Sequence, residues 1–460
     1  MNRFIQKRHA LSSLLSLLSF WGLLTNISAA GTENSLTNLS LTKNDRILIL
    51  APHPDDEVIG CGGIIQEATK TGAKIKVLYL TEGEHNPISL VTYKKRLFFK
   101  DKQQAFIKLG QVRKQESIEA LGTLGIDETR LIFLDYPDSG IMPIFVEHWG
   151  RGNEYQDSLT GLYQAAEGEG VIPNSPYTGE AILNEIENVL REFRPTKIFC
   201  SHPLDQHGDH IGMYLFLKVA LWDLGKEIPK PEIYLYLVHY RRWPSPRGFH
   251  PDKRLFPPEK LGALNLSWFS FPLNPAQIEK KRLAVMKFQS QIRYSRDYLL
   301  SFVRSNEIFS EDFKAIPLGV GLNYSLKGEG KIKNISFRSE DSRLTVEIRF
   351  VKRRSKTGTI RETLYLFGYQ KEKAFKDMPK IKIGFRSNKG YVYNQGRLIR
   401  RTGIAFAFKP NGVSFRIPLA LLGNPDFILS SLRSGLSGAQ IDRWSSWRVI
   451  NLTAGRNQLD

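Results

Sequence analysis

Between Arg46 and Val238, short apolar runs rich in β-branched residues alternate with longer segments of helical periodicity. The runs that predict buried strands are Arg46–Ala51, Lys74–Thr81, Leu131–Leu134, Lys197–Ser201 and Ile233–Val238. The intervening segments that predict helices include Val58–Thr71, Val112–Leu124 and Ala181–Phe193. This alternation predicts an α/β fold, a Rossmann-like, mostly parallel sheet with helices on both faces. Ligands of such sheets bind at the carboxyl ends of the strands.

The alternation is interrupted twice and then ends. Glu84–Lys102 and Ile141–Thr178 are long and weakly periodic, and we predict that they form loops around the ligand site. Beyond about Leu322, apolar and polar residues alternate between turn signals, which predicts a C-terminal antiparallel β-sandwich of roughly 130 residues. The predicted strands are Lys331–Phe337, Arg343–Val351, Arg361–Tyr369, Lys380–Arg386 and Gly403–Phe408. We therefore expect one domain at residues 45–325 and another at 326–460.

The N-terminus has the order of an export signal. Basic residues at Arg3, Lys7 and Arg8 precede an apolar run, Ala10–Leu24, and the small residues Ser28-Ala29-Ala30 follow. This order predicts a signal peptide over residues 1–30, with a polar linker at 31–44. The run is shorter than the about 20 apolar residues of a spanning helix, so an uncleaved membrane anchor is the second choice. We expect an exported, periplasmic or extracellular protein.

Positive charge is concentrated in the last part of the chain. The formal net charge is +19, and residues 331–460 hold 26 Lys and Arg against 9 Asp and Glu, a net +17. A basic, soluble surface would explain this, but so local an excess also suggests an anionic partner such as an acidic polysaccharide or a membrane surface. The export signal argues against nucleic acid. The two cysteines, Cys61 and Cys200, lie in apolar surroundings, which favours buried free thiols over a disulfide.

The first candidate site follows the first predicted strand as Ala51-Pro52-His53-Pro54-Asp55-Asp56-Glu57. On a strand-to-helix turn, His53 and Asp56 are three residues apart and can face one point. Imidazole nitrogen and carboxylate oxygen are both good ligands for Zn²⁺. Asp55 could stay off the metal and take a proton from an attacking water. The following Gly60-Cys61-Gly62-Gly63 allows close backbone approach at the helix start.

The second candidate site, His202-Pro203-Leu204-Asp205-Gln206-His207-Gly208-Asp209-His210, also follows a predicted strand. His207 and His210 are three residues apart, and one of them could complete a His-Asp-His triad that leaves a coordination position open. The other could remain a protonatable group beside the metal, oriented by Asp205 or Asp209 as a second-shell partner. His202 and a further strand-end residue, His239, could line the pocket or serve a structural purpose.

These residues, together with "RILILAPHPDDEVIGCGGII", "VLYLTEGE", "VRKQESIEALGTLGI…LIFLDYPDSG" and "DQHGDH", resemble the PIG-L (LmbE-like) zinc-dependent N-deacetylases over about Asp45 to Val238. By position, the resemblance implies His53, Asp56 and His210 as Zn²⁺ ligands. It implies Asp55 as the general base and His207 as an electrostatic stabiliser of the oxyanion. Arg113 and Asp138 match positions that help shape the substrate pocket.

The C-terminal stretches "GVSFRIPLALLGNPDF" and "DRWSSWRVINL" are similar to the ends of carbohydrate-binding-module-like sandwiches. Aromatic residues there could stack on sugar rings or fill the core: Tyr391, Tyr393, Trp444 and Trp447.

We expect an exported zinc hydrolase that removes the acetyl group from an N-acetylated, GlcNAc-type sugar of a glycan or glycolipid. In the mechanism that we expect, Asp55 activates water and a protonated His207 helps to hold the oxyanion. The alternative is a non-catalytic glycan-binding protein with a deacetylase-like fold.

Overall fold

The computed structural model describes residues 36–94, 102–264, 266–319, 321–322, 332–351, 360–386, 389–436, 439–440 and 447–453. The expected signal peptide, residues 1–30, lies outside the described residues. The chain divides into a unit that ends at Asn38, whose described part includes β1 (Thr37–Asn38), and a second unit, Leu39–Asp460. Of the described helices, none is long and apolar enough to cross a lipid bilayer.

The second unit is built on a mixed sheet that contains the five predicted strands. These are β2 (Arg46–Ala51), β3 (Lys74–Thr81), β4 (Leu131–Tyr136), β5 (Lys197–Ser201) and β6 (Glu232–Tyr236). They pair in parallel in the order β6-β5-β2-β3-β4, which confirms the α/β prediction. Two strands that we did not predict, β8 (Asn306–Glu311) and β7 (Trp268–Pro272), continue the sheet beyond β6 in antiparallel pairing.

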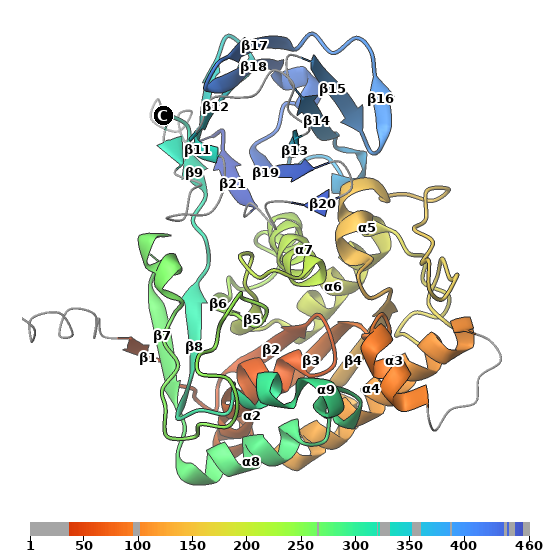
Figure 1. Cartoon of the computed structure of the whole chain (residues 1–460), viewed down its shortest axis with the longest axis vertical. Helices are drawn as coiled ribbons and strands as arrows, with labels where there is room; N and C mark the ends of the chain where they lie inside the picture. The colour runs from red at the N-terminus through yellow and green to blue at the C-terminus, as the bar shows by residue number, and fades with distance from the viewer. Residues whose placement is uncertain are drawn as a thin grey trace, which may run out of the picture. The chain divides into compact units, whose positions relative to one another are not determined.

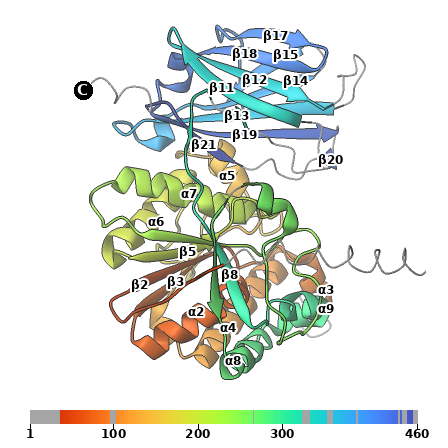
Figure 2. The ribbon, with the colours of Figure 1, turned by 90° about the vertical axis from the view of Figure 1, so that its left-hand side faces the viewer.

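Helices cover both faces of this sheet (Figures 1 and 2). One face carries α2 (Asp56–Thr71), α4 (Lys102–Leu124) and α8 (Pro275–Val285), and the other carries α5 (Ile141–Glu147), α6 (Gly179–Phe193) and α7 (Gly208–Leu224). Helix α3 (Pro87–Lys94) packs against α9 (Gln289–Leu300). Short 3-10 turns occur at Glu128–Arg130 and Glu259–Leu264.

The two regions predicted as loops both contain helices, and that prediction was wrong in part. Helix α3 lies within Glu84–Lys102, and α5 lies within Ile141–Thr178. Helix α5 has only seven residues, too few to produce a convincing periodic pattern in the sequence. It is stabilised by tertiary packing, because its apolar residues Ile141, Ile144 and Phe145 are fully buried in the core that it shares with α7.

A buried ion pair supports α2, the helix that begins at Asp56. The helix kinks at Cys61, where the backbone leaves helical geometry. Lys281 Nζ donates to the Ile59 carbonyl at 2.9 Å, and Glu307 accepts from Gly63 N at 2.7 Å and Ile64 N at 3.2 Å. A Cβ atom on Gly63 would lie 3.0 Å from a Glu307 oxygen. The missing side chain at Gly63 thus leaves room for the Lys281–Glu307 ion pair, as expected of a glycine that allows close approach to the backbone.

The C-terminal region forms two antiparallel sheets. One has the order β10-β11-β12-β18-β17, from Gly321–Leu322, Ile332–Glu340, Arg343–Phe350, Gly412–Pro418 and Ala405–Lys409. The other has the order β16-β15-β14-β13-β19-β21-β9, from Arg397–Ile399, Lys389–Asn394, Lys380–Arg386, Ile360–Tyr369, Phe427–Leu436, Arg448–Asn451 and Ile316–Pro317. Strand β20 (Ala439–Gln440) pairs with β19, and 3-10 turns lie at Phe375–Asp377 and Leu419–Leu422.

Both sheets contribute to one buried apolar cluster, which includes Phe337, Val346 and Phe415 from the first sheet and Ile383 and Ile428 from the second. Among the described strands of these two sheets, the one parallel pairing joins β9 to β21. The C-terminal sheets therefore begin at Ile316, ten residues before the boundary expected at 326.

The second of these sheets packs against the helices of the α/β part through aromatic side chains. The ring of Phe145 in α5 lies 5.9 Å from Phe367 in β13 and 6.1 Å from Trp447, while Trp222 in α7 stacks on Phe427 at 5.1 Å. Trp447 is 1% exposed, so of the two alternatives left open by the sequence the structure supports a place in the core and not stacking on sugar rings. Trp444 lies outside the described residues. Tyr391 is 49% exposed on β15.

Candidate metal centre

Each histidine motif follows a parallel strand and begins a helix at the same edge of the sheet. Strand β2 ends at Ala51 and α2 begins at Asp56, and strand β5 ends at Ser201 and α7 begins at Gly208. Strands β2 and β5 are hydrogen-bonded neighbours, so their following turns meet. The Ser201 hydroxyl donates to the His210 carbonyl at 2.8 Å, which ties the first turn of α7 to the end of its strand.

Three potential ligand atoms from His53, Asp56 and His210 converge. His53 Nδ1 lies 3.2 Å from Asp56 Oδ2, His210 Nε2 lies 3.1 Å from the same oxygen, and the two nitrogens are 3.3 Å apart. Donor atoms on a tetrahedral Zn²⁺ with bonds of about 2.0–2.1 Å are separated by about 3.3 Å. The spacing of the three atoms therefore fits a tetrahedral ion with further positions open.

The electrostatics of the same three residues also fit a cation. Asp56 and His210 are fully buried, and Asp56 Oδ1 has no hydrogen-bond partner. Burial opposes the charged form of Asp56, but His210 and His53 outweigh it and hold its pKa well below the usual value. Burial likewise disfavours the protonated form of His210, yet Asp205 and Asp56 raise the pKa of His210 to about 10. The potential at this point is negative, which favours a bound metal ion.

Three carboxylates contact the outer ring nitrogens of His53 and His210, the nitrogens that do not face the triad. Asp209 Oδ2 lies 3.1 Å from His53 Nε2, and Asp138 Oδ1 lies 3.3 Å from the same nitrogen. Asp205 Oδ2 lies 3.2 Å from His210 Nδ1. A carboxylate on the outer nitrogen of a metal-binding histidine fixes the ring and increases its basicity.

These carboxylate contacts differ from the sequence interpretation. We expected Asp205 or Asp209 to orient the His207 ring, but their short contacts to ring nitrogens are to His210 and His53, and Asp209 lies 3.9 Å from His207 Nδ1. Asp205 holds His207 through the backbone, because its Oδ1 accepts from the His207 amide at 3.0 Å. Asp138, expected to shape the substrate pocket, contacts His53 instead. The carboxyl ends of β2, β4 and β5 meet only in the folded sheet, so linear spacing does not reveal these partners.

Asp55 lies beside the triad in a strained backbone conformation, with φ of 123° at the N-terminal end of α2. Its amide donates to Glu57 Oε2 at 3.0 Å, and Arg113 Nη2 lies 3.4 Å from Asp55 Oδ2. Burial raises the pKa of Asp55 to about 7, against the opposing effect of Arg113. The charges of Asp56, His53 and His210 also act on this carboxyl, which has the pKa of a base that works near neutral pH.

Arg113 contacts the Asp55 carboxylate and is itself buried. It is 5% exposed, and its guanidinium also donates to the carbonyls of Gly83 and Pro54. We expected Arg113 to shape the substrate pocket. In the structure its guanidinium joins the turn that follows β2 to the turn that follows β3. Glu57, to which we assigned no function, accepts from the Ser117 hydroxyl at 3.1 Å and supports the Asp55 amide.

His207 is the N-cap of α7, and its side chain is 32% exposed. Its ring lies 4.6 Å from that of His53, and its Nδ1 accepts from Asp209 N at 3.3 Å. The neutral ring therefore carries its proton on Nε2. Burial and the neighbouring His53 lower the pKa of His207, so the structure favours a neutral N–H donor over the protonated form that we expected.

Potential ligand atoms of other residues lie close enough to join a metal set. His207 groups with His53 and His210, and His239 groups with Asp56 and His210, each within 4.8 Å. The His239 ring lies 4.8 Å from that of His210, and its Nδ1 is 3.1 Å from the Tyr298 hydroxyl. His239 therefore belongs to the centre, and its place after β6 was the only sequence signal. His202 is buried against Trp268 and stands outside these groups.

Both cysteines are buried free thiols, as predicted.

Part of the chain matches a known protein family. Residues 48–221 match the PIG-L family, described as GlcNAc-PI de-N-acetylase. A glucosamine-6-phosphate deaminase-like protein of Bacteroides thetaiotaomicron is 24% identical over 286 residues, 54% of this chain and 36% of that protein. A 1D-myo-inositol 2-acetamido-2-deoxy-alpha-D-glucopyranoside deacetylase of Kineococcus radiotolerans is 30% identical over 176 residues, 37% of this chain and 42% of that protein.

The chain thus spans less than half the length of these two relatives. Among solved structures, N,N'-diacetylchitobiose deacetylase from Pyrococcus horikoshii aligns with a TM-score of 0.36 and 18% identity, over 58% of this chain and 84% of that one. The resemblance stated from the sequence motifs is confirmed by the family match: residues 48–221 of this chain form a PIG-L family domain.

Proposed function

We propose that this protein is a zinc-dependent hydrolase that removes the acetyl group from an N-acetylated, GlcNAc-type sugar of a glycan or glycolipid. The observation that carries the proposal is the triangle of His53 Nδ1, Asp56 Oδ2 and His210 Nε2, with sides of 3.1–3.3 Å, beside a carboxyl of raised pKa on Asp55. The PIG-L match and the deacetylase named among the relatives support the same reaction class.

His53, Asp56 and His210 would hold the ion, and Asp138, Asp205 and Asp209 would hold the two imidazole rings. When bound, Zn²⁺ would supply Lewis-acid chemistry, making water more acidic and polarising the acetyl carbonyl.

Asp55 would act as the general base. With a pKa of about 7, a large share of this carboxyl is ionised at neutral pH and can take the proton of the attacking water. Arg113 positions the carboxylate through its contacts to Pro54 and Asp55, and its charge favours the ionised form. The proton gained by Asp55 can then pass to the amine that leaves when the amide C–N bond breaks, which yields acetate and the free amino sugar.

His207 would stabilise the oxyanion that develops from the acetyl carbonyl. Its Nδ1 is occupied as an acceptor by the Asp209 amide, so its Nε2–H is the donor left for substrate. One such donor typically contributes a rate factor of about 10²–10³. The relative exposure of His207 within a buried cluster agrees with contact to substrate.

Acetate release by the full-length protein tests the proposal. We would assay N-acetylated monosaccharides, chitin oligomers and N-acetylglucosaminyl phospholipids, with metal content measured in parallel. Asp55→Asn should keep bound zinc and lose acetate release by at least about 10²-fold, in the range of general-base catalysis. The exposed Asp252→Asn should match the wild type. Zinc-loaded Asp55→Asn with full activity would contradict the mechanism.

The second candidate is a non-catalytic glycan-binding protein, favoured by the basic C-terminal region and by the exposed Tyr391. Glycan binding by the wild type without acetate release from any substrate would establish it.

We further propose that the two C-terminal sheets form a β-sandwich that contacts an anionic polysaccharide or membrane surface, and that the protein is exported. N-terminal sequencing of the protein recovered outside the cytoplasm tests the export.

A further inference from the structure

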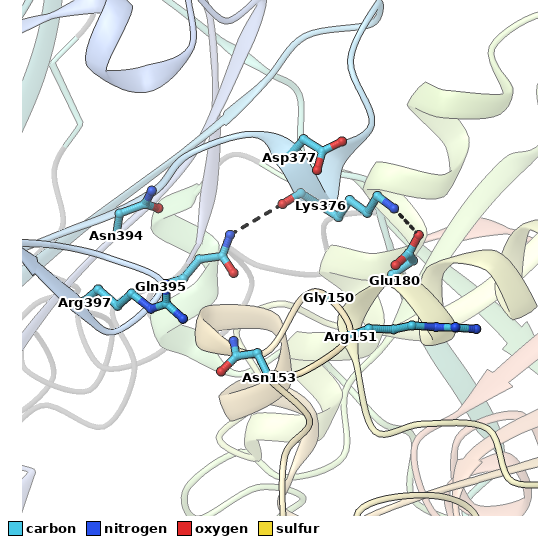
Figure 3. Close-up of a pocket in the computed structure, with 9 residues that line it drawn as sticks. All are labelled: Gly150, Arg151, Asn153, Glu180, Lys376, Asp377, Asn394, Gln395 and Arg397. Atoms are coloured by element: carbon cyan, nitrogen blue, oxygen red, sulfur yellow. Dashed lines mark hydrogen bonds and ion pairs between the residues drawn. The ribbon is translucent and has the colours of Figure 1, made fainter.

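A pocket of about 670 Å³ lies where the C-terminal sheets meet the ends of α5 and α6 (Figure 3). Its residues are Gly150, Arg151, Asn153 and Glu180 from the α/β part and Lys376, Asp377, Asn394, Gln395 and Arg397 from the C-terminal part. The volume falls in the range of small-molecule sites, about 300–1,000 Å³. Every side chain in this lining is polar or charged, so the pocket suits a hydrophilic ligand.

The walls of the pocket are held together, yet hydrogen-bonding groups remain available. Lys376 Nζ donates to Glu180 Oε1 at 2.6 Å across the two walls. Asn394 uses its carbonyl oxygen to accept from Lys380 N at 2.8 Å, which leaves its amide N–H groups as donors. Asn153 uses its amide nitrogen toward the Glu147 carbonyl, which leaves its oxygen as an acceptor. Adjacent donors and acceptors of this kind suit the hydroxyl groups of a sugar.

Arg397 supplies an available positive charge. Among the residues that the structure describes, no carboxylate forms an ion pair with it, and its side chain is exposed. In Figure 3 it reaches from its strand toward Asn153, on the opposite wall. A guanidinium binds carboxylate and phosphate groups through charge-assisted, bidentate hydrogen bonds. The net +17 of residues 331–460 would attract the same anions.

The pocket is connected to the metal centre by two short segments. Helix α5 begins at Ile141, whose amide donates to Asp209 Oδ1 at 3.2 Å, and ends just before the pocket; seven residues span about 10 Å. The chain then returns from Asn153 to Asp157, which lies 3.4 Å from His85, and the His85 amide donates to Asp138 Oδ2 at 3.1 Å. The N-terminal end of α5 therefore lies at the metal centre, and the chain that follows its C-terminal end lines the pocket.

We propose that this pocket binds an acidic unit of the glycan whose N-acetyl group lies at the metal centre, with Arg397 on the carboxylate or phosphate and the two asparagines on hydroxyls. The identity of the glycan rests on the proposed function, whereas binding in the pocket does not require hydrolysis. The anion could be a uronic acid or a phosphodiester, and both present the same negative oxygens to Arg397.

The first test measures binding without any N-acetyl group. Calorimetry on the full-length protein would use a glucuronic acid hexamer, a glucose hexamer joined by phosphodiesters and a neutral glucose hexamer. Arg397→Gln should weaken binding of one acidic hexamer about tenfold. Arg400→Gln is the matched control, because Arg400 is exposed near Arg397 in sequence but does not line this pocket. The acidic hexamer that binds identifies the anion.

Equal binding of acidic and neutral hexamers would overturn the proposal, as would equal losses in the two variants. The second test measures kinetics on a hexamer that alternates N-acetylglucosamine with glucuronic acid or carries phosphodiesters. Arg397→Gln should raise KM about tenfold with little change in kcat, and leave N,N'-diacetylchitobiose hydrolysis unchanged. If no substrate releases acetate but the binding difference persists, the proposed hydrolysis fails and the pocket assignment stands.

Discussion

Replacement of Asp209 by asparagine should weaken the metal centre without unfolding the protein. Asp209 is fully buried, and its Oδ2 lies 2.6 Å from Ser139 N and 3.1 Å from His53 Nε2, while its Oδ1 accepts from Ile141 N at 3.2 Å. Asparagine has nearly the same shape but exchanges one acceptor oxygen for an NH₂ group. Whichever way the amide turns, a donor faces another donor, and His53 Nε2 loses one of its two negative partners and keeps Asp138.

The magnitude follows from the contacts that are lost. A hydrogen bond to a charged group contributes about 1.5–3 kcal/mol, which corresponds to about 10- to 100-fold in affinity. Loss of an outer partner of a metal-binding histidine has effects in the same range. We therefore expect Asp209→Asn to bind zinc about 10- to 100-fold more weakly than the wild type.

Competition with a chromophoric chelator measures zinc affinity, and circular dichroism monitors the fold in parallel. The matched control is Asp223→Asn, because Asp223 lies near the far end of the same helix, α7. A folded Asp209→Asn protein with wild-type zinc affinity would refute the reasoning, and so would an equal loss in Asp223→Asn.

Three further predictions concern stability, and urea unfolding checks each. Lys281→Met leaves Glu307 buried and without its cation and should lower the free energy of unfolding by about 3–5 kcal/mol, whereas adding Glu307→Gln should restore part of the loss. Trp447→Ala should cost about 3–5 kcal/mol because this side chain fills the core between the α/β part and the C-terminal sheets; an unchanged stability would contradict that placement. Burial and Asp135 raise the pKa of Glu82 from 4.5 to about 8, so its contribution to stability is fully present below pH 4.5 and declines as pH rises to about 8. Glu82→Gln should flatten that decline, and parallel pH profiles for variant and wild type would argue against it.

The sequence predicted the α/β part best where local chemistry is strongest. The strands β2 to β6 are short and apolar, and the residues that follow β2 and β5 combine imidazole and carboxylate groups at a spacing that suits metal ligands. Where the periodicity is weaker, the prediction missed elements of the structure. It missed α5, which is stabilised by packing, and β7 and β8, which pair in antiparallel register beyond β6.

The carboxylates behind the imidazole rings illustrate the limit of linear reasoning. Asp209 is next to His210 in sequence but contacts His53, because neighbouring strands place the first turn of α7 beside the turn after β2. Asp138 reaches the same ring from the end of β4. From proximity in the sequence we expected each histidine to contact a carboxylate of its own motif. The folded sheet instead brings residues of the two motifs together at one edge.

The amino-acid sequence by itself determined the PIG-L resemblance, the strand–helix alternation and the residues from which a metal triad could form, because these depend on residue type and short-range spacing. Only the tertiary structure decided which atoms converge, that Arg113 stands behind Asp55, and that Trp447 lies in the core that joins the C-terminal sheets to α5 and α7. Those outcomes depend on contacts between residues that are far apart along the chain. Such contacts are fixed by burial and strand order, which spacing along the chain does not specify.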